Sequence, residues 1–367
     1  MNEHEANRTA VAREADGATL LRSATRALTE VGSTTPRLDA ELLLAALLAT
    51  RVSTLRTAVA AGFPLPLPLN AELPEPTPLA DAHPSLAEAL RIARAALSAG
   101  DAGAALDALI AERGRGRPIS HLTGRRGFRA LELLVTPDVL DPRPESELII
   151  ESALAFITDR TAAARALGRP PQPLNVAEIG TGSGALAIAL VDEARAPLRL
   201  TATDISSEAL AVARANALRT GVGSRITFVH GDLAEPLIGT RAPGDPPHLD
   251  LLIANLPYVP TAEVDAAHAA ASFHPEGETH RDLSHVTIAA EPRRALDGGS
   301  DGLELIRRLV AELPRLLRPG GAALLEFGDG QSAAIVQLVD GLGLGWRVAI
   351  RDDLAGHPRM AEVRRSG

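Results

Sequence analysis

Hydrophobic residues recur with helical spacing through the first third of the chain. The spacing predicts four helices, over residues 18–31, 37–48, 86–97 and 104–113. Thr35 and Pro36 precede the second helix, and a hydroxyl residue followed by Pro is typical of a helix start. The segment LDAELLLAALL is apolar around most of its circumference, so we expect it to be buried among neighbouring helices. These segments predict a small helical domain over residues 17–117.

Three stretches of the N-terminal half lack this spacing. Residues 1–16 are polar and acidic and predict a disordered tail. Residues 63–84 carry Pro at a density that neither a helix nor a central strand accepts, so we expect an extended insertion there. Short apolar stretches between residues 119 and 135 favour a β-hairpin. Residues 118–144 would then form a hairpin and linker.

From Leu174 onwards, strand-like segments alternate with helical ones. The strand-like segments are LNVAEIG, LRLTATD, ITFVHGD, LDLLIANLPY, AALLEFG and WRVAI. This alternation predicts an α/β domain over residues 145–367, with a parallel, doubly wound sheet and helices on both faces. Such sheets bind ligands at the carboxyl ends of their strands. We therefore expect the chemistry where strands end, at Gly180, Asp204, Asp232 and Asn255.

The composition narrows the class of function. There is no Cys, which excludes disulfides, thiolate metal sites and a Cys nucleophile and fits a reducing compartment. No apolar run reaches the roughly 18 residues of a membrane span, and the first residues contain no secretory signal, so we expect a cytoplasmic protein. The net charge of −9 argues against stable binding of nucleic acid through its phosphates.

All 37 basic residues are Arg, and several of them cluster before the sheet domain. The cluster consists of Arg113, Arg115, Arg117, Arg125, Arg126 and Arg129. Two interpretations stay open for it: a solvated surface, or a docking patch for an acidic partner.

A Gly-rich loop follows the first predicted strand of the sheet domain. It has the sequence Glu178-Ile179-Gly180-Thr181-Gly182-Ser183-Gly184. Glycines allow a tight turn and a close approach of a ligand to the backbone. A pyrophosphate favours a helix N-terminus without a carboxylate. The preceding acid and the G-x-G-x-G spacing therefore favour the ammonium-bearing methionine part of S-adenosylmethionine over a dinucleotide; the alternative is a purely structural turn.

Acidic residues close the next two strands. Asp204 ends the second strand, where a carboxylate suits the two hydroxyls of a ribose. Its alternative role is to cap the helix that begins at Ser206 or Ser207. Asp232 ends the third strand and would accept the adenine amino group, while Leu233 packs on the ring; the alternative is a polar turn. Three such strand ends in succession predict a cofactor site for S-adenosylmethionine.

The fourth strand ends in Asn255-Leu256-Pro257-Tyr258, which contains the only Tyr. The nitrogen of an amide or base NH2 is a weak nucleophile because its lone pair is delocalised. The Asn255 side-chain oxygen and the Leu256 carbonyl can each accept one of its N–H groups. Pro257 stiffens the turn, and Tyr258 offers a flat face for stacking. The motif predicts methyl transfer to a planar nitrogen, with an ordinary Pro-containing turn as the alternative.

These motifs together resemble the peptide chain release factor N5-glutamine methyltransferases. The resemblance rests on the Gly loop, Asp204, Asn255–Tyr258 and above all the loop Asp141-Pro142-Arg143-Pro144-Glu145-Ser146-Glu147. It implies a helical N-terminal domain, a hairpin linker and a seven-stranded methyltransferase domain. It also implies a substrate glutamine in the Gly-Gly-Gln motif of release factors, which the N-terminal domain helps to dock. By this resemblance the cofactor would lie on Gly180–Gly184, Asp204, Leu233 and Asn255, and the substrate amide on Asn255–Tyr258. Arg143 and Glu145 would lie near the substrate loop, or they would form ion pairs within the chain.

The sequence departs from that family's usual pattern at position 256, where Leu replaces Pro, and in a long segment over 266–290. That segment contains His268, His274, His280 and His285, which favour a surface loop over a metal site. The Asn-Leu-Pro-Tyr motif is also similar to that of rRNA adenine dimethyltransferases. Three hypotheses follow. The chain is a protein-glutamine methyltransferase, for a release factor or for another protein such as a ribosomal protein; a nucleic-acid N-methyltransferase; or a non-catalytic relative that only binds release factors.

Overall fold

The chain divides into two compact units. The computed structural model describes residues 17–61, 73–75, 83–170, 172–239, 247–272 and 289–367. The first unit comprises Met1–Arg125 with Ala266–Ala290, and the second comprises Arg126–Asp265 with Glu291–Gly367. The predicted tail and most of the predicted Pro-rich insertion lie outside the described residues.

The described residues of the first unit up to Thr123 fold mainly into helices. These helices are α2 (Gly17–Glu30), α3 (Pro36–Leu47), α4 (Val52–Ala60), α5 (Pro84–Ser98), α6 (Ala102–Gly114) and α7 (Ile119–Thr123). The four predicted helices are confirmed as α2, α3, α5 and α6. The other two lack a strong pattern, because α4 buries only Leu55 and α7 is five residues long.

Helix α3 is buried in this unit, as its apolar circumference predicts. Leu43, Leu44 and Leu47 are fully buried in a core that α2, α5 and α6 complete. Pro36 opens the helix as expected, but the Thr35 hydroxyl donates to Asp39 instead of capping the backbone. Among the described helices, none alone has the length and apolar composition of a membrane span. Only α3 and α4 taken together pass that test, and the pair is bent by 100°.

Most of the Arg cluster is engaged in ion pairs within the chain. The pairs are Arg113 with Asp39, Arg115 and Arg117 with Glu112, Arg126 with Asp141, and Arg129 with Glu193. Arg113 is only 8% exposed. A solvated surface is therefore the wrong interpretation for Arg113, while a docking role for the more exposed members stays a prediction.

A short hairpin follows the helices. It pairs β1 (Arg125–Phe128) with β2 (Leu131–Leu134) in a separate two-stranded sheet. The predicted hairpin over 119–135 is confirmed in a narrower form. Its first residues belong to α7, which ends at Gly124 in the left-handed region, with φ of 71°. A glycine tolerates that conformation at a helix end without steric cost.

The second unit is built on a seven-stranded sheet. Its strands are β3 (Leu174–Ile179), β4 (Leu198–Asp204), β5 (Ile226–His230), β6 (Leu249–Ala254), β7 (Leu317–Glu326), β8 (Trp346–Asp352) and β9 (Pro358–Arg365). They lie in the order β5-β4-β3-β6-β7-β9-β8. The first five are parallel, and β9 is antiparallel to both of its neighbours. The expectation of a purely parallel sheet is wrong at β9, and the seven-stranded α/β fold is confirmed.

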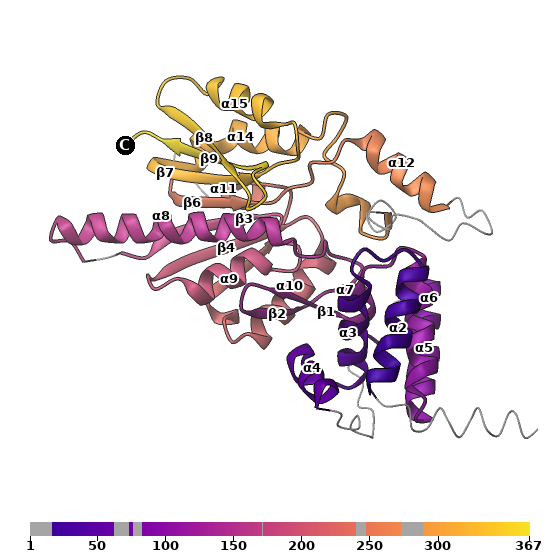
Figure 1. Cartoon of the computed structure of the whole chain (residues 1–367). Helices are drawn as coiled ribbons and strands as arrows, with labels where there is room; N and C mark the ends of the chain where they lie inside the picture. The colour runs from indigo at the N-terminus through magenta and orange to yellow at the C-terminus, as the bar shows by residue number, and fades with distance from the viewer. Residues whose placement is uncertain (1–16, 62–72, 76–82, 171, 240–246, 273–288) are drawn as a thin grey trace, which may run out of the picture. The chain divides into compact units, whose positions relative to one another are not determined.

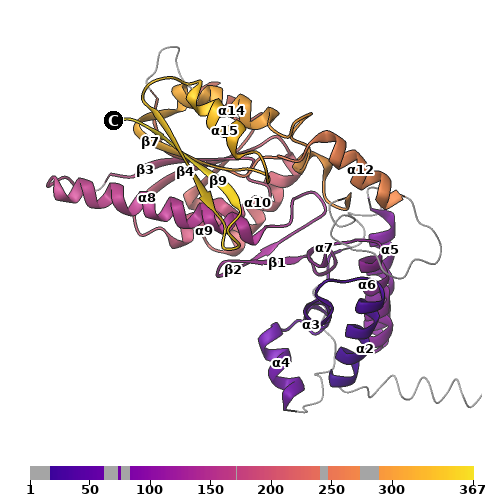
Figure 2. The ribbon, with the colours of Figure 1, turned by 45° about the horizontal axis from the view of Figure 1, so that its top comes forward.

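Helices cover both faces of this sheet (Figures 1 and 2). The helices are α8 (Glu147–Ala166), α9 (Ala185–Glu193), α10 (Ser207–Arg219), α14 (Glu304–Leu316) and α15 (Ser332–Asp340). Alternate residues of a strand enter opposite cores, as the two-residue period of a strand requires. Val176 packs with α8 and α9, whereas Ala177 packs with α14 and α15. The predicted doubly wound arrangement is confirmed.

The strand ends bring the candidate residues to one edge. Since β3 to β7 are parallel, their carboxyl ends all lie on the same side of the sheet. Gly180 follows β3, Asp204 ends β4, Asp232 follows β5 and Asn255 follows β6. Glu326 ends β7 on the same edge. The loop over 141–147 reaches this edge through Ser146, which donates a hydrogen bond to Glu326.

Candidate active site

The Gly-rich loop turns the chain sharply from β3 into α9. Gly180, Gly182 and Gly184 all have positive φ, of 72°, 53° and 83°. The amides of Gly180 and Thr181 both donate to the Thr203 carbonyl at 2.9 Å, which fixes the loop against β4. A Cβ on Gly184 would lie 3.0–3.2 Å from atoms of Ile188 and Ala213. Only glycine combines this backbone conformation with this close packing.

Glu178 lies beneath the loop and is 1% exposed. Its carboxylate accepts hydrogen bonds from the Thr181 hydroxyl at 2.6 Å and the Ala187 amide at 3.1 Å. Burial raises the pKa of Glu178 to about 8, against the opposing effect of these two hydrogen bonds. Glu178 therefore fastens the loop to the first turn of α9. Its predicted contact with the methionine ammonium stays a prediction.

Thr181 and Ser183 are buried as well, at 4% exposure each. The Thr181 hydroxyl is directed to Glu178, and the Ser183 carbonyl accepts from the Asn216 side chain at 2.9 Å. Thr181 and Ser183, both predicted to bind the cofactor, are thus fixed by hydrogen bonds to buried side chains. Any contact they make with a ligand is expected to come from their backbone groups.

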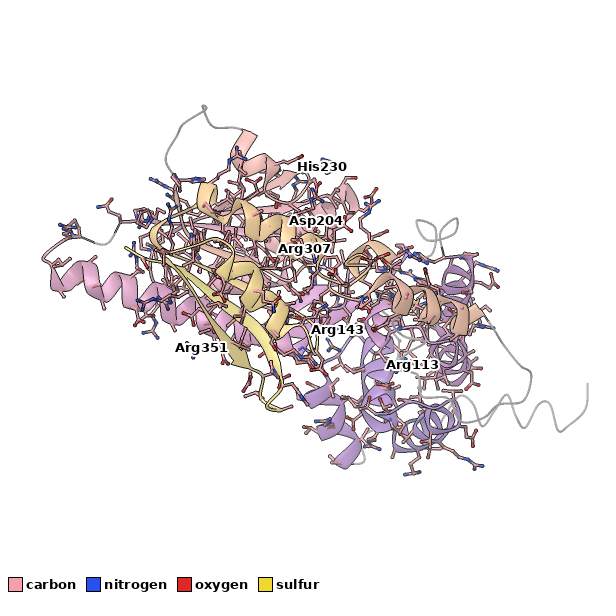
Figure 3. The ribbon with its side chains drawn as sticks, turned by 90° about the horizontal axis from the view of Figure 1, so that it is seen from above. Arg113, Arg143, Asp204, His230, Arg307 and Arg351 are labelled. Carbon is pink, nitrogen blue, oxygen red and sulfur yellow. The ribbon has the colours of Figure 1, made fainter. Side chains whose placement is uncertain are left out.

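Asp204 connects the Gly loop to the start of α10. One carboxylate oxygen accepts from the Gly182 amide and the other from the Ser206 amide, both at 2.8 Å. The helix cap is Ser206, whose hydroxyl accepts from the Ala209 amide, so capping is not the role of Asp204. Asp204 is half-buried and retains acceptor capacity on both oxygens. Figure 3 shows it beside His230, its partner in the pairing of β4 with β5.

The turn after β5 contains Asp232 and Leu233. Asp232 forms an ion pair with Arg308 of α14. Leu233 adopts φ of 46°, which is unusual for a residue with a side chain, and its carbonyl accepts from the Thr203 hydroxyl at 3.3 Å. Strained backbone of this kind concentrates at functional sites. The predicted contacts of both residues with adenine stay predictions.

Asn255-Leu256-Pro257-Tyr258 leaves β6 next to the Gly loop. Leu256 is 4% exposed, and a Cβ on Gly180 would lie 3.0 Å from its Cδ2 atom. The Asn255 amide nitrogen donates to the Ser146 hydroxyl at 2.8 Å. The hydroxyl of Tyr258 lies 3.4 Å from Glu326. Burial, and to a smaller extent the charge of Glu326, raises the pKa of Tyr258 above its usual range. The four residues are held at the edge where β3 and β6 end side by side.

Glycines and a glutamine pack around the far end of this motif. A Cβ on Gly298 would lie 2.6 Å from the Pro257 carbonyl, and one on Gly302 would overlap the Tyr258 carbonyl. Gln331 donates to the same Tyr258 carbonyl at 2.9 Å. Leu at position 256 therefore does not leave the motif loose, because burial of its side chain and close backbone packing fix the turn.

Two further side chains complete the site and were not among the predicted residues. The Ser146 hydroxyl donates to the Glu326 carboxylate at 2.6 Å, and both residues are buried. Burial raises the pKa of Glu326 to about 7. Both lie in segments that the sequence singles out, since Ser146 is part of the Asp141–Glu147 loop and Glu326 lies in the predicted strand AALLEFG. An acid within the otherwise apolar run AALLEF is the signal that identifies Glu326.

Arg143 forms an ion pair with Glu291, as the alternative interpretation predicts. Glu291 is buried and also accepts from the Asp141 amide at 3.0 Å, so it fastens the loop within the second unit. Burial raises the pKa of Glu291, and the charge of Arg143 opposes that shift. Glu145 is exposed. Whether Arg143 and Glu145 also contact a substrate stays a prediction.

The residues around the Gly loop fit S-adenosylmethionine. A Cβ on Gly182 would meet no heavy atom within 4 Å, so the loop is open at that position. Asp204 presents a half-exposed carboxylate for ribose hydroxyls, and the partly exposed Leu233 offers an apolar surface for a ring. For a metal, the described residues hold no group of three or more His, Cys, Asp or Glu side chains in a suitable arrangement. Of the four His of the segment 266–290, only His268 is among these residues.

Comparison with known proteins identifies relatives over most of the chain. A family model described as a methyltransferase domain matches residues 176–277. A release factor glutamine methyltransferase from Moorella thermoacetica is 36% identical over 250 residues, which cover 68% of this chain and 76% of the relative. One from Xylella fastidiosa is 35% identical over 312 residues, which cover 83% of this chain and 100% of the relative.

Solved structures that are similar to this chain are also found. One is the release factor-specific protein-(glutamine-N5) methyltransferase from Alicyclobacillus acidocaldarius, with 24% identity and a TM-score of 0.37. The match covers 62% of this chain and 94% of that chain. The sequence relatives, rather than this likeness, determine the family.

Proposed function

The chain belongs to the release factor glutamine methyltransferase family, and on that premise we propose its substrate and cofactor. It transfers a methyl group from S-adenosylmethionine to the side-chain amide nitrogen of the glutamine in the Gly-Gly-Gln motif of a peptide chain release factor. The helical unit serves to dock that partner. The absence of Cys fits a reducing compartment, and we place the reaction in the cytoplasm.

One observation carries the proposal. Asn255 and Leu256 leave the end of β6 next to the Gly loop, with Leu256 packed against Gly180, and Tyr258 follows two residues later beside Glu326. A planar NH2 has two N–H donors and needs two acceptors in its own plane. The Asn255 oxygen and the Leu256 carbonyl supply them, and Tyr258 stacks on the amide plane.

Position and polarity account for the catalysis. S-adenosylmethionine, when bound, supplies an electrophilic methyl group. The two acceptors draw electron density toward the N–H bonds, which raises the electron density on the nitrogen and directs its lone pair out of the plane. Alignment of reacting groups contributes on the order of 7–11 kcal/mol in favourable cases. No general base is required, because a methylated amide nitrogen is cationic and loses its proton to water.

Different residues of the cofactor half of the site, which comprises the Gly loop, Asp204, Asp232 and Leu233, are assigned to different parts of S-adenosylmethionine. In the proposal, the backbone of Gly180–Gly184 and the Glu178 carboxyl group face the methionine part. Asp204 binds the ribose hydroxyls, Asp232 the adenine amino group, and Leu233 the face of the adenine ring. Support comes from the half-exposed carboxylates of Asp204 and Asp232 at successive strand ends.

A methyl-transfer assay tests the proposal. Labelled S-adenosylmethionine is offered with a purified release factor, with the same factor carrying Gln→Ala in its Gly-Gly-Gln motif, and with bulk RNA. We expect label on the release factor and none on the variant. Label on RNA, or no label on the factor while the cofactor still binds, contradicts the proposed substrate.

A further inference from the structure

A chain of hydrogen bonds connects the buried Glu326 carboxylate to the Asn255 amide. The Ser146 hydroxyl donates to Glu326 Oε2 at 2.6 Å and accepts from Asn255 Nδ2 at 2.8 Å. Ser146 is 4% exposed and Glu326 is 2% exposed, so water competes little for these bonds. The three residues come from the 144–146 turn and from the ends of β6 and β7.

The order of donors along this chain is determined by the carboxylate. An ionised carboxylate only accepts hydrogen bonds, and a hydroxyl has a single proton to donate. With the Ser146 proton committed to Glu326, the Ser146 oxygen can only accept from Asn255. The NH2 group of Asn255 must therefore face Ser146, which leaves its Oδ1 atom on the other side. The two ends of an asparagine amide have nearly the same shape, so its hydrogen-bond partners decide its orientation.

We infer that Ser146 and Glu326 are positioning residues that hold the Asn255 side-chain oxygen toward the substrate amide. The inference rests on the function proposed above. In this orientation Asn255 offers an acceptor to the glutamine NH2. In the reversed orientation it would present its own NH2 to that group, and two donors would face each other.

Protonation of Glu326 would permit the reversed orientation. A neutral carboxyl group donates a hydrogen bond to Ser146, whose proton is then free for Asn255 Oδ1. Burial raises the pKa of Glu326 to about 7; Glu145 raises it, while hydrogen bonds from Ser146 and Tyr258 and the charge of Arg359 lower it. Because the ionised form is the competent one, kcat is expected to rise as pH rises through the neutral range.

Nuclear magnetic resonance of the full chain tests the orientation without a substrate. The sequence contains six Asn residues, so selective ¹⁵N-asparagine labelling yields few side-chain signals, and Asn255→Asp identifies the relevant pair. At pH 8 we expect nuclear Overhauser contacts between the Asn255 NH2 protons and the Ser146 β-protons. Glu326→Gln should weaken them. Absence of these contacts from the wild-type protein at pH 8 would overturn the inference.

Kinetics test the consequence for catalysis. We expect Ser146→Ala and Glu326→Gln each to lower kcat by about 10- to 100-fold, the range seen when a residue that orients another active-site group is removed. The Kd for S-adenosylmethionine should stay unchanged, Ser146→Thr should retain most of the activity, and Glu326→Gln should lose the pH dependence. Wild-type kcat in Ser146→Ala or Glu326→Gln would contradict the inference. The inference would also be contradicted if kcat fell equally in Ser146→Ala and Ser146→Thr and if Glu326→Gln kept the pH dependence of the wild-type protein.

A matched variant controls for the loss of a buried carboxylate. Glu362 of β9 is 7% exposed and is bonded to Arg351 and Arg364, and we expect Glu362→Gln to leave kcat unchanged. The two proposals fail in different ways. If the nuclear Overhauser contacts are found but no label appears on a release factor, the proposed substrate is wrong and the proposed orientation of Asn255 stands. If label appears on the release factor but the nuclear Overhauser contacts are absent, the proposed orientation is wrong and the proposed substrate stands.

Discussion

The two halves of the strand-end edge are held by different kinds of contact. On the cofactor half, backbone amides of Gly180, Thr181 and Gly182 bond to β4, and the Gly182–Asp204 bond joins residues 22 apart in sequence. On the reacting half, side chains form the contacts. Ser146 is 109 residues from Asn255 and 180 residues from Glu326. One half is thus built from neighbouring segments, and the other from segments far apart in sequence.

The difference predicts how each half responds to substitution. Backbone contacts survive the loss of most side chains, so the loop of the cofactor half should be damaged mainly at its glycines and at Glu178, which fastens it to α9, and Asp204 should matter chiefly for binding. Side-chain contacts disappear with a single replacement. Changes on the reacting half should therefore alter the rate of methyl transfer and leave cofactor binding largely intact.

The largest effect is expected at the reacting half, from Asn255→Ala. The change removes one of two acceptors for the substrate NH2, and we expect kcat to fall by about 10²- to 10³-fold. The Kd for S-adenosylmethionine should change by less than about threefold, because the remaining residues assigned to the cofactor are untouched. Single-turnover transfer and calorimetry measure the two quantities.

Asn175→Ala is the matched control for that variant. Asn175 is half-buried in β3, where its side chain donates to the His248 carbonyl at 3.2 Å, and the described structure places it at the opposite end of the strand from the Gly loop. Its kcat should stay at the wild-type value. If Asn255→Ala kept wild-type turnover, the assignment of the Asn255 oxygen as an acceptor would be wrong.

The next effect is expected at the cofactor half, from Asp204→Ala. Hydrogen bonds to a charged group contribute roughly 1.5–3 kcal/mol, so we expect the Kd for S-adenosylmethionine to rise by about 10- to 100-fold. At saturating cofactor, kcat should recover to near the wild-type value. Calorimetry and a cofactor titration of the rate separate these two outcomes.

Asp353→Ala controls for the loss of backbone contacts in that variant. Asp353 accepts from the Ala355 and His357 amides in the turn between β8 and β9, much as Asp204 accepts from Gly182 and Ser206. We expect it to leave the Kd for the cofactor unchanged. Equal cofactor affinity in Asp204→Ala and wild type would remove Asp204 from the site.

The same contrast explains what the sequence could predict. The cofactor half follows local signals, namely a strand, a glycine loop and an acid at the next strand end, and the structure brings these residues to one edge. Ser146 and Glu326 escape prediction as a pair, because nothing local indicates that residues so far apart in sequence share a hydrogen bond. Their contact depends on which strands the fold sets side by side.

The antiparallel strand β9 shows the same limit in the fold. Alternation of strands and helices predicts parallel neighbours, but no helix separates β8 from β9. Asp353, Gly356 and His357 instead form a tight turn, in which Gly356 has φ of 84°. A hairpin of this kind makes β9 antiparallel and inserts it between β7 and β8. The order of strands in a sheet is a tertiary property, which periodicity does not determine.

A smaller effect is expected from Arg143→Ala, which tests a side-chain contact that supports the reacting half. The change leaves the buried Glu291 carboxylate without its ion-pair partner and with only the weaker charge effect of Arg126, so we expect the free energy of unfolding at pH 8 to fall by about 1–3 kcal/mol. Arg160→Ala is the control. Asp250, the partner of Arg160, also pairs with Arg318 and keeps a cation, so the loss should be smaller.

The cost of Arg143→Ala should depend on pH. Burial raises the pKa of Glu291 in the folded protein, and the loss of Arg143 raises it further. When the pKa of a carboxyl group is higher in the folded than in the unfolded state, the free energy of unfolding falls as pH rises from the unfolded pKa to the folded pKa. The difference from wild type should therefore shrink as pH is lowered toward 5. Denaturant titrations at pH 8 and pH 5 measure it, and a constant difference would contradict this account of Glu291.

The smallest effect is expected from Leu256→Pro, which exchanges a side chain but keeps the backbone carbonyl that we assign to the substrate. Pro fills less of the space beside Gly180, so the free energy of unfolding should fall by about 1 kcal/mol. Since the turn is already fixed by Gly298, Gly302 and Gln331, added rigidity should change kcat by no more than about threefold. Methyl transfer at saturating cofactor measures this. A gain of tenfold or more would mean that packing does not replace the rigidity of proline at this position.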